Sequence, residues 1–247
     1  MKKNFLLVII CVIAVLCASA LSAAADPIRV AVNPDAKPFK YLNDDGVFSG
    51  IDAEVMNGIA ESQGFEVEYI VKDFEEILEA VANCEVDAAI SALTMTTERS
   101  SMVSFSEPYV MGMQSAFIRM KNDDFTDISD EGIKVIGAKA GTTGEKNARI
   151  IAEIADKEVK LYPDYESLFQ ALEGDVIDAA IADELLTKQI VDGLADIMSI
   201  GQPISAETYA IAVCPSNKDL VKSINDGLNS MRRSGKLDEI VLENLMK

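Results

Sequence analysis

The sequence predicts an α/β protein made of two similar lobes, each with a mostly parallel sheet. One stretch is used twice: residues 74–92, FEEILEAVANCEVDAAISA, align without a gap to residues 165–183, YESLFQALEGDVIDAAIAD, at an offset of 91 residues. In each copy an aromatic residue opens a short amphipathic helix, and the apolar run that follows is typical of a strand buried on both faces of a sheet. Elsewhere strand and helix patterns alternate. Chance similarity between two ordinary helix–strand units is the competing explanation.

The first 25 residues are predicted to be a signal peptide rather than part of the fold. Lys2 and Lys3 precede an almost wholly apolar run, and Ala23 and Ala25 place small residues just before Asp26. An uncleaved membrane anchor is the alternative, because residues 5–25 are also long enough to span a bilayer. We therefore expect the mature chain in the periplasm or outside the cell.

The first part of the mature chain reads as alternating elements. A strand at 28–32 ends in a proline-containing loop, and Asp44-Asp45-Gly46 forms a turn. A helix at 53–62 ends at Gly64, a typical C-cap, before a strand at 65–71. The first repeat copy follows, with its strand at 86–90. A helix then begins around residues 96–99, behind a threonine N-cap.

The rest of the chain continues the alternation. Thr142 and Glu145 stand at capping-box spacing, which predicts the start of a helix reaching about residue 155. The other predicted strands are 113–118, 133–138, 158–161, 177–181, 197–200 and 209–213, and the other predicted helices begin at 165, 185, 219 and 236. Leu220, Ile224 and Leu228 form one apolar stripe on the helix that begins at 219.

Charge and composition exclude several functions. The net charge is −19, and it becomes −21 without the two signal-peptide lysines, so the chain repels nucleic acid and anionic lipid. Histidine, the commonest general base and metal ligand, is absent. With only two cysteines in the mature chain, a Cys/His zinc site cannot form. We expect no metal and no cofactor.

The two remaining cysteines are candidates for a disulfide. Cys84 precedes the predicted strand 86–90, and Cys214 follows the predicted strand 209–213. If these strands are antiparallel neighbours, the two thiols meet at one edge of the sheet, in an exported protein where a disulfide persists. Two buried free thiols are the alternative.

Four segments that directly follow strands are candidates for a ligand site, because ligands of open α/β sheets bind beyond the carboxyl ends of the strands. These are residues 33–39, 92–99, 139–145 and 183–184. Two of them are helix starts that suit a carboxylate, and Arg99 adds a guanidinium. Asp183 at a strand end suits an ammonium. An anion seat beside a cation seat predicts an α-amino acid ligand, with Phe74 covering its side chain.

Each of these residues also has a structural explanation. Arg99 could form a surface ion pair, and Asp183 could cap the helix that follows it. Thr94, Thr96 and Thr142 could be helix caps, and Phe74 and Tyr165 could belong to the core. Asp87 and Asp178 begin their strands, so we expect them to be structural.

Four motifs carry a resemblance to a known family. They are VDAAISALTMTTERSSMVSFSEPY at 86–109, GID at 50–52, AGTTG at 140–144 and IDAAIAD at 177–183. The chain resembles the polar amino-acid family of extracellular solute-binding proteins over nearly all of residues 28–245. The resemblance implies a type II periplasmic-binding-protein topology, with two lobes joined by two crossing strands. By this likeness residues 26–111 and 204–247 form lobe 1, and residues 112–203 form lobe 2.

The resemblance also implies roles for individual residues. Arg99 and the Thr94 N–H resemble the carboxylate clamp of lobe 1, and Thr142 with Thr143 the contact from lobe 2. Asp183, helped by the Ala92 carbonyl, resembles the ammonium partner. Phe74 occupies the place of a stacking aromatic. Asn33 and Lys139 lie where members of the family commonly recognise the side chain of the ligand. The chain departs from the family at Ala36, where an aromatic is usual, at Cys84, where a glycine is usual, and in its tail, which lacks the common Lys-Trp ending.

These observations predict a monomeric, exported, non-enzymatic protein that delivers a polar amino acid to the membrane permease of an ABC importer. One alternative is a same-fold enzyme resembling cyclohexadienyl dehydratase, with Glu107 or Glu184 as the acid. Another is a ligand-sensing partner of a membrane receptor. The ligand's side chain stays open at this point, because Lys139 near a carboxylate seat suggests an acidic amino acid but could serve any ligand.

Overall fold

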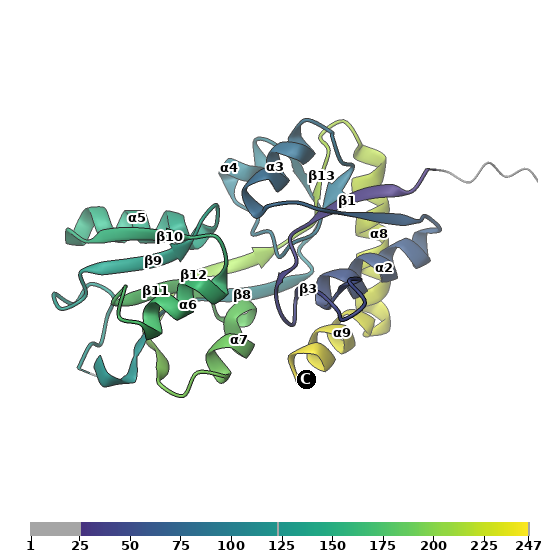
Figure 1. The fold of residues 1–247 in the computed structure, drawn as a ribbon. Helices are drawn as coiled ribbons and strands as arrows, with labels where there is room; N and C mark the ends of the chain where they lie inside the picture. The colour runs from purple at the N-terminus through teal and green to yellow at the C-terminus, as the bar shows by residue number, and fades with distance from the viewer. Residues whose placement is uncertain (1–25, 123, 247) are drawn as a thin grey trace, which may run out of the picture.

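The computed structural model describes residues 26–122 and 124–246, which form two α/β lobes side by side. Figure 1 shows the N-terminal and C-terminal parts of the chain together in one lobe, at the right, and the middle of the chain in the other. The predicted signal peptide, residues 1–25, lies outside the described residues. Among the residues that are described, no helix combines the length and the apolar character needed to cross a membrane.

Lobe 1 is built on a five-stranded mixed sheet. Its strands lie in the order β5 (Val67–Val71), β1 (Ile28–Val32), β6 (Ala88–Ala89), β13 (Ala212–Val213) and β7 (Ser104–Phe105). The first three are parallel, whereas β13 runs antiparallel to both of its neighbours. A small antiparallel sheet of β2 (Asp35–Ala36), β3 (Lys40–Leu42) and β4 (Phe48–Ser49) joins the lobe. Its helices are α2 (Ile51–Gln63), α3 (Phe74–Ala82), α4 (Thr97–Ser100), α8 (Lys218–Ser234) and α9 (Lys236–Leu245).

Lobe 2 repeats this arrangement. Its sheet has the order β10 (Glu158–Tyr162), β9 (Val135–Lys139), β11 (Ala179–Asp183), β8 (Val110–Arg119) and β12 (Ile197–Tyr209). Again the first three neighbouring strands are parallel, and β8 runs antiparallel to both of its neighbours. Its helices are α5 (Thr143–Ala155), α6 (Tyr165–Glu173) and α7 (Glu184–Asp192), with a 3-10 turn, η1 (Met120–Asn122). Each sheet is therefore mixed but mostly parallel, as predicted, because one strand, β13 or β8, runs opposite to the other four.

The two repeat copies occupy equivalent places in the two lobes. The pairs α3–β6 and α6–β11 each place a central parallel strand beside β1 and β9, respectively. Asp87 accepts hydrogen bonds from the backbone N–H of Arg29 (2.9 Å) and from its guanidinium. Asp178 likewise accepts from the N–H of Val135 at 2.9 Å. Both acids tie the start of one strand to the next, as predicted for structural residues, and the equivalence argues against a chance repeat.

Two long strands, β8 and β12, connect the lobes. They pair antiparallel in two stretches, separated by an irregularity between Ile200 and Ser205. Gly201 lies there with φ of 69°, in the left-handed region that favours glycine. The sequence predicts strands at 197–200 and 209–213, whereas in the structure β12 continues from Ile197 to Tyr209 and β13 is a separate strand. The proposed lobe boundaries at residues 112 and 204 fall within β8 and β12 and stay a prediction.

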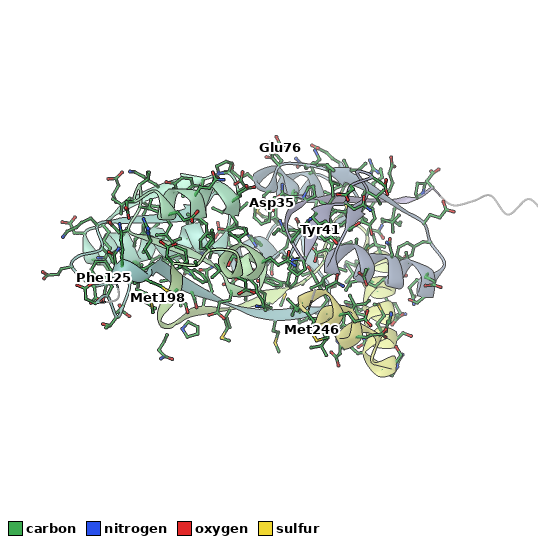
Figure 2. All side chains as sticks on the ribbon, turned by 60° about the horizontal axis from the view of Figure 1, so that its bottom comes forward. Asp35, Tyr41, Glu76, Phe125, Met198 and Met246 are labelled. Atoms are coloured by element: carbon green, nitrogen blue, oxygen red, sulfur yellow. A yellow bond between two sulfur atoms is a disulfide. The ribbon has the colours of Figure 1, made fainter. Side chains whose placement is uncertain are left out.

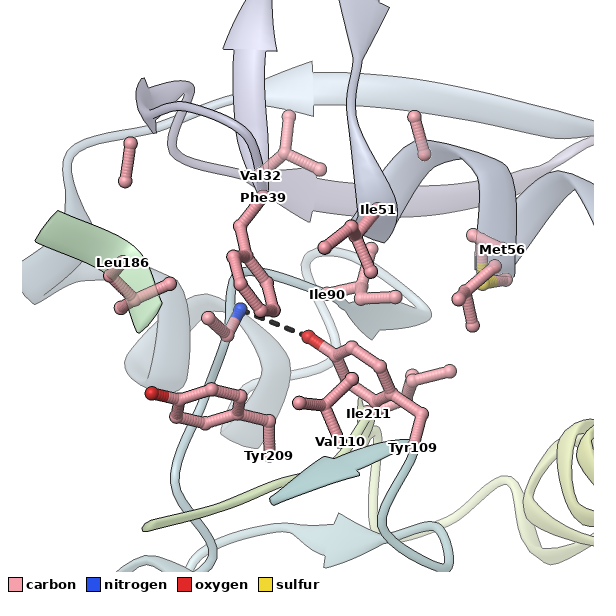
Figure 3. Close-up of a cluster of buried hydrophobic side chains, with 14 of the residues drawn as sticks. Val32, Phe39, Ile51, Met56, Ile90, Tyr109, Val110, Leu186, Tyr209 and Ile211 are labelled. Atoms are coloured by element: carbon pink, nitrogen blue, oxygen red, sulfur yellow. Dashed lines mark hydrogen bonds between the residues drawn. The ribbon is translucent and has the colours of Figure 1, made fainter. Parts of the chain in front are cut away.

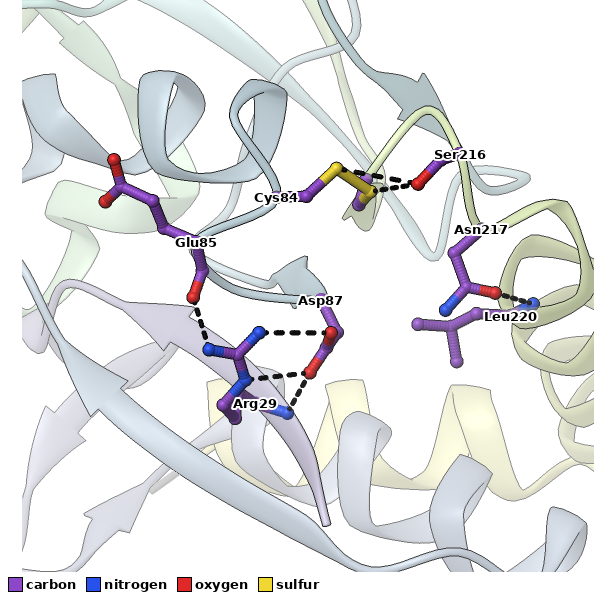
Figure 4. The surroundings of a disulfide bond; sticks show 8 residues. Arg29, Cys84, Glu85, Asp87, Ser216, Asn217 and Leu220 are labelled. Atoms are coloured by element: carbon purple, nitrogen blue, oxygen red, sulfur yellow. Dashed lines mark hydrogen bonds and ion pairs between the residues drawn. A yellow bond between two sulfur atoms is a disulfide. The ribbon is translucent and has the colours of Figure 1, made fainter. Parts of the chain in front are cut away.

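In the structure Cys84 and Cys214 form a disulfide, with Cα atoms 5.1 Å apart (Figure 4). The antiparallel pairing of β6 with β13 brings the two residues together, since Ala88 lies opposite Val213. The disulfide lies beyond the amino end of β6, the same end at which Arg29 and Asp87 pair. It therefore links the residue that follows β13 to the segment that precedes β6. This link lies at the end of the lobe 1 sheet opposite to Ala92.

The main core spans both lobes. Figure 3 shows Phe39 of lobe 1 with Leu186 of α7 on one side, Ile51 on the other and the Tyr209 ring of β12 nearby. The Phe39 and Tyr209 rings meet edge to face, with centroids 5.8 Å apart. The predicted stripe on α8 is buried against this core. Packing thus sets the carboxyl ends of the two sheets against one another.

Candidate functional site

A small cavity of about 10 Å³ lies between the lobes. Eight of the nine predicted site residues line it: Phe74, Ala92, Thr94, Arg99, Lys139, Thr142, Thr143 and Asp183. The ninth, Asn33, lies next to it and accepts a hydrogen bond from the Lys139 ammonium at 3.1 Å. The lining also includes Lys40, Tyr165 and Leu186, which were not among the predicted site residues. This volume is room for about one water molecule, so a larger ligand requires the lobes to part.

Arg99 is held inside the cavity wall and is not a surface ion pair. It lies in α4, whose N-cap Thr96 accepts a hydrogen bond from the Arg99 backbone N–H at 3.2 Å. Its guanidinium donates to the Thr94 carbonyl at 2.9 Å and, across the cleft, to the Gly141 carbonyl at 3.0 Å. Only 8% of Arg99 is exposed. Burial lowers its pKa, against the opposing charges of Glu207 and Asp183.

The threonine hydroxyls of the two lobes converge on a buried carboxylate, Glu207. Thr94 donates to it at 2.5 Å and Thr143 at 2.9 Å, while Ser205 donates to its other oxygen at 2.6 Å. Glu207 lies on β12, 1% exposed. Sequence reasoning missed it because it follows no strand–loop–helix pattern and lies within a connecting strand.

Thr142 is the N-cap of α5, as the capping-box spacing predicts. Its hydroxyl accepts from the Glu145 N–H at 3.3 Å and donates to the Lys139 carbonyl at 2.7 Å. The Glu145 carboxylate accepts from the Gly141 N–H at 2.8 Å, one residue earlier than in a standard capping box. Gly141 has φ of 73°, and its carbonyl is the one that Arg99 contacts. The turn therefore presents the start of α5 to lobe 1.

Asp183 ends β11 with its carboxylate turned to two tyrosines. It accepts hydrogen bonds from Tyr165 at 3.0 Å and from Tyr209 at 2.8 Å. It occupies the N-cap position of α7 but makes no side-chain cap bond, which excludes the capping explanation. Burial and then the charge of Glu207 raise its pKa to about 6, although both tyrosine hydrogen bonds and Lys40 oppose this.

Ala92 closes the first repeat where Asp183 closes the second, and its backbone is held by a buried network. Its N–H donates to Asp52 at 2.9 Å and contacts the Tyr109 hydroxyl at 3.2 Å, the bond drawn in Figure 3. The Tyr109 hydroxyl donates to Asp52 at 2.6 Å. Burial raises the pKa of Asp52 to about 6. The network fixes Ala92 in its left-handed conformation, with φ of 47°.

The aromatic residues that open the two repeats both contact the same ammonium. The Lys139 nitrogen lies 4.7 Å from the centre of the Phe74 ring and 5.2 Å from that of Tyr165. Arg99 and Lys40 also approach the Phe74 ring, at 5.9 and 5.4 Å. Phe74 is half-buried at the cavity wall, so it is not simply a core residue.

Lys40 and Lys139 share one carboxylate, Asp35, which lies between the lobes in Figure 2. Lys40 belongs to lobe 1 and Lys139 to lobe 2, so this contact crosses the cleft. Burial acts to raise the pKa of Asp35, but the two lysine charges lower it overall. Burial, followed by the charge of Lys40, lowers the pKa of Lys139 to about 8.

Ala36, where the family usually has an aromatic residue, does not line this cavity. It lines a separate, wider cleft of about 620 Å³ between the small sheet of lobe 1 and helices α6 and α7. Phe169 and Ile190 line the opposite side of that cleft. The residues that line the two spaces are different, and Asp35 lies between them through its contacts with Lys40 and Lys139.

The two acids considered for catalysis do not line the cavity. Glu107 is exposed and pairs with Arg232 at 2.6 Å, and Glu184 accepts a hydrogen bond from the Ser115 hydroxyl. Across residues 26–122 and 124–246 no group of His, Cys, Asp and Glu side chains is arranged to hold a metal ion. The cavity offers charged and hydroxyl groups for binding a small polar ligand.

Comparisons with known proteins agree with this architecture. Over 218 residues the chain is 27% identical to a probable histidine-binding protein of Campylobacter jejuni, spanning 87% of this chain and 83% of that protein. Over 224 residues it is 29% identical to the ABC transporter glutamine-binding protein of Bacillus subtilis, spanning 87% and 80%. The solved structure of an ancestral arginine-binding protein bound to arginine matches with a TM-score of 0.83 and 29% identity, covering 90% of this chain and 99% of that one.

The match to a family extends over most of the chain. The sequence model for bacterial extracellular solute-binding proteins, family 3, matches residues 28–245 of the 247. With two α/β lobes joined by two strands and a polar cavity between them, the chain belongs to this family of extracellular solute-binding proteins.

Proposed function

We propose that this protein is exported, captures a polar α-amino acid between its lobes and delivers it to the membrane permease of an ABC importer. The observation that carries the proposal is that Arg99 of lobe 1 and Asp183 of lobe 2 line one cavity. A guanidinium and a carboxylate on facing walls match the two charges of a zwitterion. The relatives named for histidine, glutamine and arginine binding support the same class of ligand.

The ligand carboxylate binds to Arg99, to the Thr94 N–H and to the turn at Thr142 and Thr143, and the ammonium binds to Asp183. Arg99 already reaches across the cleft to the Gly141 carbonyl, so its guanidinium is positioned between the lobes. A ligand that contacts both lobes binds the closed form more tightly than the open form and shifts the population toward closure. Strands β8 and β12 serve as the hinge, at the stretch where residues 110–113 of β8 pair with residues 206–209 of β12.

Calorimetry on purified protein tests this proposal. We expect at least one of the twenty common amino acids to bind with micromolar or tighter affinity, about −8 kcal/mol. Arg99→Ala removes the carboxylate partner and should weaken binding by about 3 kcal/mol, by analogy with breaking a buried ion pair. The matched control is Arg233→Ala, since Arg233 is exposed on α8 and lies outside the cavity. Undiminished binding by Arg99→Ala would contradict the assigned clamp.

Delivery to a permease needs a separate test, because sensing would use the same cavity. Cells that lack this protein should take up the identified amino acid more slowly at micromolar concentration, and the wild-type gene should restore uptake. Normal uptake combined with a lost response to the amino acid would favour a receptor partner instead.

A further inference from the structure

Two buried lysines at the cavity wall have no role in the zwitterion site described above. Lys40 lies on β3 of lobe 1 and Lys139 ends β9 of lobe 2, and the side chain of each is 1% exposed. Both line the cavity. We call them the basic pair. A buried ammonium is unfavourable unless an anion and hydrogen-bond acceptors compensate for its lost hydration, so their partners decide what the pair can bind.

The two ammonium groups of the basic pair have one carboxylate in direct contact between them. Lys40 donates to the Asn33 carbonyl at 3.0 Å, to its amide oxygen at 3.3 Å and to Asp35 at 2.5 Å. Lys139 donates to the same amide oxygen at 3.1 Å and to the other oxygen of Asp35. Two ammonium groups therefore share a single carboxylate. An ammonium has three N–H donors, and the remaining one of Lys139 has only the Phe74 and Tyr165 rings near it among the contacts described.

The other nearby carboxylates are bound elsewhere. Asp52 accepts from Ala92 and Tyr109, and Asp183 accepts from Tyr165 and Tyr209. Asp164, whose charge also acts on Lys139, accepts from the N–H and hydroxyl of Ser167 at the start of α6. The charges of these carboxylates act on the basic pair without direct contact, since Lys40 acts on Asp52 and Asp183 and Asp164 acts on Lys139. Among the contacts of the described residues, Asp35 is thus the one carboxylate that touches the two ammonium groups.

We propose that the captured amino acid has an anionic side chain, and that its side-chain carboxylate binds to Lys40 and Lys139. The inference rests on the proposed amino-acid site at Arg99 and Asp183. The Phe74 ring connects the two places, because Arg99 approaches it at 5.9 Å and Lys139 at 4.7 Å. When the lobes part, Lys139 leaves Asp35, and on closure the ligand supplies the second anion.

The same geometry disfavours other side chains. An arginine or lysine ligand would bring a third cation to two ammonium groups, and like charges brought together are strongly unfavourable. A glutamine or asparagine ligand offers an acceptor oxygen but no charge. Burial and the Lys40 charge already lower the pKa of Lys139 to about 8, so a second anion would also hold this ammonium in its charged form.

Calorimetry at pH 7 with L-glutamate, L-aspartate, L-glutamine, L-asparagine and L-arginine tests the inference on the wild-type protein. We expect glutamate or aspartate to bind at least tenfold more tightly than its amide and more tightly than arginine. If an amide or arginine binds more tightly than both acids, the inference is wrong and the proposed function stands. If none of the twenty common amino acids binds, both fail.

Variants then locate the preference. Lys139→Met and Lys40→Met should each weaken binding of the acidic ligand at least tenfold more than they weaken binding of its amide, and Lys139→Arg should keep most of the preference. Lys146→Met, which removes an exposed lysine paired with Glu98 at the cleft rim, is the matched control and should leave the preference unchanged. An unchanged preference in both methionine variants would overturn the inference; if they fail to fold, the Lys139→Arg protein and the wild-type panel still decide it.

Discussion

Asp183 shows how one residue can couple stability and binding to pH in opposite directions. Burial and Glu207 raise its pKa to about 6, from the ordinary value of 3.8. Between these values the folded protein binds more protons than the unfolded chain, so the free energy of unfolding contributed by this group increases as the pH falls. Asp52, with a pKa also raised to about 6, adds to the same trend.

Ligand affinity should follow the opposite course. Protonation of Asp183 removes the partner of the ligand ammonium, so affinity should fall about tenfold per pH unit below pH 6. Calorimetry between pH 5 and 7.5 measures this slope. The slope should persist in Asp52→Asn, whatever its absolute affinity, because Asp52 contacts Ala92 and not the proposed ammonium seat. An affinity that stays constant down to pH 5 would contradict the role of Asp183.

At this scale the sequence predicts those site residues that lie at strand ends and helix starts. Arg99, Thr142 and Asp183 follow predicted strands, so their meeting at one cavity could be anticipated. Lys40 and Glu207 could not, because each lies within a strand whose neighbours across the cleft depend on how the lobes pack. For these two residues the only indication in the sequence was that a charged residue lies within a strand.

The elements show the same division between local and long-range information. The helix–strand repeat encodes α3–β6 and α6–β11 locally, through apolar stripes and buried runs. The pairing of β13 with β6 joins residues more than 120 positions apart. In the sequence, only the positions of the two cysteines indicated this pairing. The sequence predicts strands at 197–200 and 209–213 and leaves residues 201–208 unassigned, whereas pairing with β8 extends β12 through them to Tyr209.

The disulfide should stabilise lobe 1 without influencing ligand binding. It closes a loop with a sequence separation of 130 residues, which restricts the unfolded chain strongly. Replacing both cysteines by serine should lower the free energy of unfolding by about 2–4 kcal/mol, measured by denaturant titration. Affinity should change less than twofold, since Cys84 and Ala92 lie beyond opposite ends of β6. A large loss of affinity with unchanged stability would show that the bond instead shapes the cavity.

For the whole molecule, contacts between the lobes set the balance between open and closed forms. Several polar contacts join the lobes at the cleft, among them Lys139 with Asp35, Arg99 with the Gly141 carbonyl, and Lys146 with Glu98. Lys139 is buried, whereas Lys146 and Glu98 are exposed, with 57% and 73% of their side chains accessible. An exposed ion pair contributes at most about 1 kcal/mol, while breaking a buried one costs about 3–5 kcal/mol.

Asp35→Asn should therefore open the ligand-free protein. The substitution leaves two buried ammonium groups without a carboxylate, and parting of the lobes lets water solvate them. Spin labels at residues 61 and 153, exposed positions on α2 and α5, report the distance between the lobes. We expect this distance to increase in Asp35→Asn and to stay at the wild-type value in Glu98→Gln, which breaks the exposed pair. Equal distances in all three proteins would mean that packing of Phe39, Tyr209 and Leu186, rather than the buried charges, holds the lobes together.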